Sequence, residues 1–150
     1  MLRAMCSSRV VAGILVVMLA GGICVAETVN VNPHKIVLNA KGAFDDVQAN
    51  VNIALPGAPV IDFDVTLSFN GTAVAEAESA FYCILDNILI IGFDRTDLQN
   101  NPDVQALANQ TVTAEVTGSV TVKNAAGDEI TRSFNGSDTV EIVAPGDKGK

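Results

Sequence analysis

Three segments of the chain alternate apolar and polar residues with a period of two. They are DDVQANVNIAL (residues 45–55), VIDFDVTLSFNGT (60–72) and QTVTAEVTGSVTV (110–122). Successive side chains of a β-strand point to opposite faces of its sheet, so this alternation is typical of strands with one buried and one solvent-exposed face. The pattern therefore predicts a chain built mainly from β-strands around a shared core.

Two apolar segments predict a hairpin. AFYCIL (80–85) and ILIIGF (88–93) flank Asp86 and Asn87, which are turn residues. Because both segments are apolar at nearly every position, we expect both strands to be central, with both faces covered. The residues expected in the core of this hairpin are Ile84, Ile88, Ile90 and Phe93.

Shorter segments complete the list of expected elements. Further strands are predicted at residues 27–33, 35–39, 72–77 and 130–143, and residues 72–77 follow an Asn-Gly turn as a short edge strand. One helix is predicted within RTDLQNNPDVQALA (95–108), where Asn101 before Pro102 is a reasonable start and Asp94 or Thr96 a natural cap. Gly118, on the apolar face of its strand, predicts a bend or bulge. Seven or eight strands with one short helix predict an all-β fold, an antiparallel β-sandwich.

The amino terminus has the pattern of a secretory signal peptide. Arg3 and Arg9 precede an apolar run and then small residues, with cleavage expected after Ala26. The apolar run is shorter than the roughly 20 residues of a spanning helix. Lipidation of Cys24, as in a bacterial lipoprotein, is the alternative. We therefore expect a signal peptide at 1–26, a sandwich domain at 27–143 and a flexible tail at 144–150, in a secreted or cell-surface protein.

Cleavage at that point changes the charge and the cysteine content. The remaining chain has seven basic and seventeen acidic residues, a net charge of −10, which disfavours nucleic acid and anionic membranes as partners. Only Cys83 remains of three cysteines, so no intrachain disulfide can form. Cys83 lies in an apolar run, which predicts a buried and unreactive thiol.

Four motifs resemble a known family. They are VNVNPHKIVLNAKG (29–42), IGFDRTDLQ (91–99), VTAEVTGSV (112–120) and FNGSDTVEIV (134–143). Together they resemble an immunoglobulin-like β-sandwich domain of secreted and cell-surface proteins of archaea and bacteria, often found beside dockerin-like or surface-layer modules. The resemblance implies a non-catalytic extracellular module. Many relatives have a calcium-loop-like insert before the FDR motif, but ESAFYCILDNILIIGFDR stands here, so no calcium site is carried over.

Asp62 and Asp64 are the most conspicuous pair of carboxylates. In a strand they project to one face, roughly 7 Å apart, a separation that some glycosidases use. Alternation with Phe63 and Val65 places them on the solvent face, where a carboxylate is not desolvated enough to act as an acid at neutral pH. We interpret them as part of a charged outer face, and they remain weak calcium candidates.

No other motif predicts catalysis or a cofactor. His34 is the only histidine and is expected at a turn, and sequons begin at Asn70, Asn109 and Asn135. The favoured function is a structural or protein-interaction module of the cell exterior, whose partner is an envelope protein or polysaccharide. A carbohydrate-binding module is the alternative; it would need exposed aromatic rings, for which Phe44 and Phe134 are the candidates.

Overall fold

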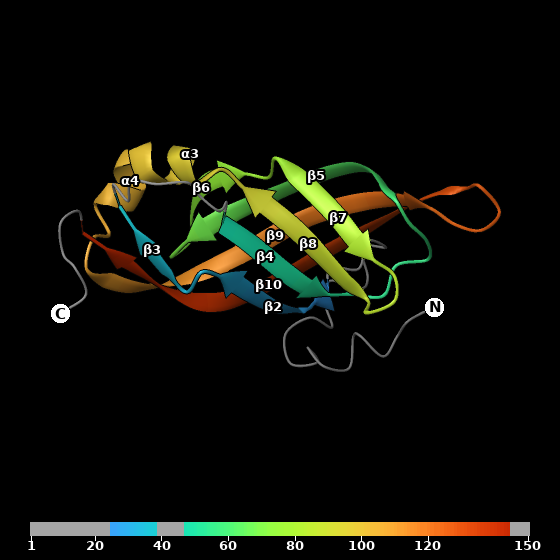
Figure 1. The fold of residues 1–150 in the computed structure, drawn as a ribbon, viewed down its shortest axis with the longest axis horizontal. Helices are drawn as coiled ribbons and strands as arrows, with labels where there is room; N and C mark the ends of the chain where they lie inside the picture. The colour runs from blue at the N-terminus through green and yellow to red at the C-terminus, as the bar shows by residue number, and fades with distance from the viewer. Residues whose placement is uncertain (1–24, 39–46, 145–150) are drawn as a thin grey trace.

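The computed structural model describes residues 25–38 and 47–144, which form a mainly β fold of two sheets with two short helices (Figure 1). The predicted signal peptide, apart from its last two residues, lies outside the described residues. The same holds for Phe44 and for the tail beyond residue 144. The two layers face one another along most of their length, and the helices lie at one end (Figure 1).

The four-stranded sheet is entirely antiparallel and has the order β2-β4-β8-β7. Its strands are β2 (Thr28–Asn32), β4 (Val47–Asn52), β7 (Ser79–Cys83) and β8 (Ile88–Phe93). The predicted hairpin is confirmed, because β7 and β8 pair directly, from Ser79 opposite Gly92 to Cys83 opposite Ile88.

The second sheet has six strands and is mixed. Five follow the order β1-β10-β9-β5-β6, and β3 also pairs with β10. Its strands are β1 (Val25–Ala26), β3 (Lys35–Val37), β5 (Val60–Phe69), β6 (Thr72–Glu76), β9 (Gln110–Lys123) and β10 (Glu129–Val143). The prediction of a purely antiparallel sandwich was wrong, because β1 and β3 pair in parallel with β10. β10 has 15 residues, so its edge is long enough to pair with both β1 and β3.

The period-two pattern correctly identified the buried faces of β4 and β9. Alternate residues of β4 and β9 are buried, and they face the core between the sheets. The fully buried aromatic side chains are Phe69, Phe93 and Phe134. The predicted edge strand is also confirmed, because β6 ends the six-stranded sheet after a turn in which Asn70 and Gly71 both have positive φ.

Gly118 marks no bulge, which was one of the two features that the sequence interpretation expected there. Its pairing with β5 and with β10 continues without a shift in register. A side chain at this position would collide with the Asp64 carbonyl, so glycine is needed for the close approach of β5. The irregularity lies in β5 instead, where the pairing shifts between Val60 and Asp62. This shift turns Ile61 outward, 42% exposed, although the alternation had assigned it to the buried face.

The prediction that both strands of the hairpin are central was wrong for β7, which ends its sheet. Ile84, predicted to be core, is 53% exposed at the β7–β8 turn. Phe93 is fully buried as predicted, whereas Ile88 and Ile90 are only partly buried. The core positions of β8 also include Leu89 and Ile91, because these side chains point toward the second sheet.

The predicted helical segment forms two helices rather than one. Helix α3 (Arg95–Asn100) ends before Asn101, and Asn101 then caps α4 (Pro102–Gln105). Proline is favourable in the first turn of a helix but cannot continue a preceding one, so Pro102 separates the two. The buried side chains of Leu98 and Val104 cover one end of the core.

Candidate functional site

Asp62 and Asp64 lie on the solvent face of β5, as predicted. Both are exposed, opposite Thr121 and Ser119 of β9. The three carboxylates that converge in the described part of the chain are different ones. The calcium candidacy of Asp62 and Asp64 therefore stays a prediction.

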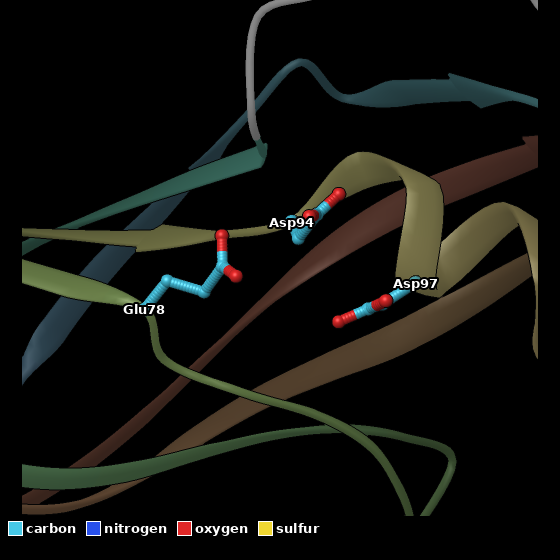
Figure 2. Close-up of side chains that lie close together, drawn as sticks. All are labelled: Glu78, Asp94 and Asp97. Carbon is cyan, nitrogen blue, oxygen red and sulfur yellow. The ribbon is translucent and has the colours of Figure 1, made fainter.

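Glu78, Asp94 and Asp97 form the acidic cluster. Each offers an oxygen within 4.8 Å of the others, and Figure 2 shows Glu78 and Asp97 directed into the same space beside Asp94. Glu78 directly precedes β7, Asp94 follows β8, and Asp97 lies in the first turn of α3. Close carboxylates are suited to bind a hard cation or a lysine or arginine side chain.

Local structure holds the acidic cluster together. Asp94 caps α3 as predicted, because its side chain accepts a hydrogen bond of 2.6 Å from the Thr96 N–H. The Glu78 N–H donates to the Gly92 carbonyl at 2.8 Å, which ties the start of β7 to β8. Asp94 and Asp97 are close in the sequence. Glu78 lies near them only because β7 pairs with β8.

The edge of the four-stranded sheet at β2 is covered by β10. Asp138 Oδ2 accepts the Val31 N–H at 2.8 Å and lies 3.0 Å from His34 Nε2. Partial burial acts to raise the pKa of Asp138, but hydrogen bonds from the N–H groups of Val31 and Thr139, together with nearby His34, outweigh it and lower that pKa below 3.8. A carboxylate that accepts an edge N–H in this way blocks further strand pairing there.

The six-stranded sheet ends in short strands on both sides. On one side β1 and β3 pair with β10. On the other side α3 and α4 contact β6, and the side-chain amide of Asn101 donates to the Val74 carbonyl at 3.0 Å. The position of these helices beside β6 is visible in Figure 1.

The edge strand β7 differs from the edge strands β2 and β6. No residue of the described ranges donates to or accepts from the outer side of this strand. Residues 79–85, which we call the β7 edge segment, include no charged residue. Three of its side chains are strongly exposed: Phe81 at 63%, Ile84 at 53% and Leu85 at 90%. Exposed apolar side chains beside unpaired strand groups are typical of a site that accepts another strand.

Tyr82 holds the β7 edge segment in place. Its side chain is buried, and its hydroxyl accepts the Leu55 N–H at 3.0 Å and donates to Asn87 Oδ1 at 2.9 Å. Asn87 has a positive φ in the turn between β7 and β8. These bonds join the turn to the loop after β4, so the exposed side chains project from a supported backbone.

Cys83 and the asparagines of the three sequons lie at exposed or partly buried positions. Cys83 is partly buried rather than fully buried, and its thiol lies 3.4 Å from Asp86 Oδ2. Asn70 and Asn109 are exposed, but their side chains accept the N–H groups of Thr113 and Ala144. Asn135 is partly buried within β10.

The aromatic residues are arranged differently from the sequence interpretation. Phe134, considered for sugar binding, is fully buried, whereas Phe81, interpreted as core, is exposed. Phe81 is the one strongly exposed aromatic ring among residues 25–38 and 47–144. Only the strand order shows that Phe81 is exposed, because a continuous apolar segment can form either an edge strand or a central strand.

No family model, curated protein or solved structure matches the chain. Within the described part of the chain, no helix is long and apolar enough to cross a membrane.

Proposed function

We propose that this protein is a non-catalytic module of the cell exterior that binds another protein along β7. The observation that supports this proposal is the β7 edge segment: it is uncharged, exposes three large apolar side chains, and forms an outer strand of its sheet with no hydrogen-bond partner on its outer side among the described residues. Edge strands of this kind accept an extended partner segment through backbone hydrogen bonds.

The proposed fold family is immunoglobulin-like. The order β2-β4-β8-β7 against β10-β9-β5-β6 follows the A-B-E-D and G-F-C arrangement of immunoglobulin sandwiches, with β6 as an added strand beside β5. The parallel pairing of β3 with β10 fits an initial strand that crosses from one sheet to the other. A secreted module with a signal peptide at 1–26 fits the same proposal.

A photo-reactive phenylalanine analogue at position 81 tests the function. It is compared with the same analogue at position 61, an exposed apolar position on the other sheet. In the cells that make the protein, we expect a discrete protein adduct from position 81 and none from position 61. Equal labelling from both positions, or no protein adduct from position 81, would contradict the proposal.

Carbohydrate binding is the second candidate, and the observation in its favour is the exposed ring of Phe81. Sugar platforms commonly combine several rings, whereas the adjacent Tyr82 is buried with its hydroxyl occupied. Retention on an envelope polysaccharide that the Phe81→Thr variant loses would favour this candidate over protein binding.

A further inference from the structure

Within the described strands, the outer face of the four-stranded sheet has no charged residue. Its strands turn alternate side chains into the core, and every outward position of β2, β4, β7 and β8 holds an amide, hydroxyl, thiol, glycine or apolar residue. The six-stranded sheet differs, because Asp62, Asp64 and Glu115 project from its outer face. In a chain with a net charge of −8, a whole sheet face without charge is suited to an uncharged ligand.

Five side-chain amides lie together on this face. Asn30 is opposite Asn50, Asn32 is opposite Gln48, and Asn52 follows Asn50 on the same side of β4. We call these five residues the amide surface. Four of them are exposed and Asn50 is partly buried, and none of their side chains has a hydrogen-bond partner among the described residues.

Asparagines in the connecting segments are used differently. The side chains of Asn70, Asn101 and Asn124 hold turns and a helix end through hydrogen bonds to backbone groups. The amide surface has no such structural task within the described part of the chain. Its donors and acceptors are therefore available to a ligand.

Asn50 points most directly to a ligand. It lies at the centre of the face, between Asn30 and Ile90 of the neighbouring strands, and its Oδ1 atom is buried without a hydrogen-bond partner. An unpaired buried acceptor costs free energy, and a β-branched apolar residue would suit this strand better. Rotation of the partly exposed amide about χ2 would present this oxygen at the surface, where a ligand hydroxyl can donate to it.

The residue types on this face indicate the class of ligand. Nucleic acids and acidic polymers require lysine or arginine, and protein interfaces concentrate their binding energy on tryptophan, tyrosine and arginine; the amide surface has none of these. Each amide instead both donates and accepts hydrogen bonds, as a sugar hydroxyl does. Ile88 and Ile90 lie beside Asn52 and Asn50, where they offer apolar contact to the carbon–hydrogen groups of a sugar ring.

We propose that the outer face of β2, β4 and β8 binds a neutral polysaccharide, whose hydroxyl groups pair with the amide surface while its rings lie against Ile88 and Ile90. This surface is separate from the outer edge of β7, so the inference goes beyond the proposed function. It also differs from the second candidate function, because it does not depend on the ring of Phe81. Each hydrogen bond at an exposed surface contributes little, so a long polymer with repeated contacts should bind better than a short oligosaccharide.

Native electrophoresis in gels that contain a soluble polysaccharide tests the proposal. The probes are a β-glucan, a mannan and a xylan, with alginate as the acidic control. We expect at least one neutral polymer to slow the migration of the protein, and alginate to leave it unchanged. Hydrogen exchange should then show protection in β2 and β4 on addition of the same polymer.

Variants that keep the charge of the chain locate the binding surface. The Asn30→Ala/Asn52→Ala variant should weaken binding by about tenfold, because it removes two hydrogen-bonding groups of the amide surface. The Asn100→Ala variant is the control, since Asn100 is an exposed amide in α3 without a side-chain hydrogen bond among the described residues. It should bind like the parent. Phe81 is unchanged in all of these variants, so the result bears on this face and not on the β7 edge.

Asn50→Val separates a binding role from a structural one. It removes the unpaired acceptor and places a β-branched residue in the strand, so the midpoint of urea unfolding should stay the same or rise while binding weakens. A structural amide would give the opposite result, a lower midpoint with unchanged binding.

Several results would overturn the proposal: no retardation by any of the three neutral polymers, retardation by alginate alone, full binding by the Asn30→Ala/Asn52→Ala variant, or a structural result for Asn50→Val. A dimer that the Asn30→Ala/Asn52→Ala variant converts to a monomer would identify a second copy of the chain as the occupant instead. A protein adduct from position 81 without polysaccharide binding would leave the proposed function standing while this inference fails. Polysaccharide binding without that adduct would give the reverse.

Discussion

At the scale of single residues, Tyr82 shows how one polar atom supports an exposed edge. Its ring is buried, as expected for a strand with both faces covered, but the bonds to Leu55 and Asn87 depend on loops brought together by the fold. The alternation of apolar and polar residues predicts which side chains are buried. It does not predict which groups form hydrogen bonds with a buried hydroxyl, so the role of the Tyr82 hydroxyl could not be found from the sequence.

The Tyr82→Phe variant tests this role. It keeps the ring but leaves the buried Leu55 N–H without its acceptor, so we expect the free energy of unfolding to fall by about 1 to 3 kcal/mol. Chemical denaturation measures the loss, and hydrogen exchange should show earlier opening of the β7–β8 turn. An unchanged free energy would mean that water replaces the hydroxyl at no cost.

Asp138 should make stability depend on pH. Because its pKa in the folded protein is lowered, its contribution to stability is complete above the unfolded-state pKa of about 4 and is lost as the pH falls through the lower folded value. The Asp138→Asn variant should therefore be less stable than the parent at pH 7, with the difference shrinking below pH 4. Urea unfolding at several pH values measures it. A difference that stays constant to pH 2 would contradict this assignment.

At the scale of elements, the local sequence patterns predicted where the strands occur along the chain better than which strands lie side by side in a sheet. The alternation in β4, β5 and β9 gave the strands and most of their buried faces, because one face of each strand contacts the core. The position of β7 at an edge depends on the preceding strand β6 joining the other sheet, which is a long-range property. For the same reason, the acidic cluster and the β7 edge segment could not be assembled from the sequence.

Neighbouring isoleucines in β8 test the assignment of its faces. Ile91 is fully buried between the sheets, whereas Ile90 is partly buried on the outer face opposite Phe81. We expect Ile91→Ala to cost about 2 to 5 kcal/mol of unfolding free energy, and Ile90→Ala no more than about half as much. Thermal and chemical denaturation of both variants give the comparison. A larger loss for Ile90→Ala would contradict the assignment of Ile91 to the inner face and Ile90 to the outer face of β8.

At the scale of the whole molecule, the covers on the sheet edges come from distant parts of the chain. β10 is the common element, because Asp138 reaches β2 while β1 and β3 pair along its outer side. The short β1 consists of Val25 and Ala26, the last two residues of the predicted signal peptide. Cleavage after Ala26 would therefore remove this strand, and lipidation at Cys24 would keep it.

Two chains that begin at Val25 and at Glu27 test whether the domain needs β1. In the shorter chain, β10 still pairs with β9 from Glu129 to Ile142, and the Glu27 nitrogen, which lies 2.6 Å from the Asn135 carbonyl, becomes the terminal amine. We expect the shorter chain to lose no more than about 2 kcal/mol, because a backbone hydrogen bond contributes about 0.5 to 1.5 kcal/mol net. Chemical denaturation gives the difference, and the intact mass of the exported protein identifies its first residue. A shorter chain that fails to fold, or an exported mass with diacylglycerol on Cys24, would place the start of the mature domain before β1.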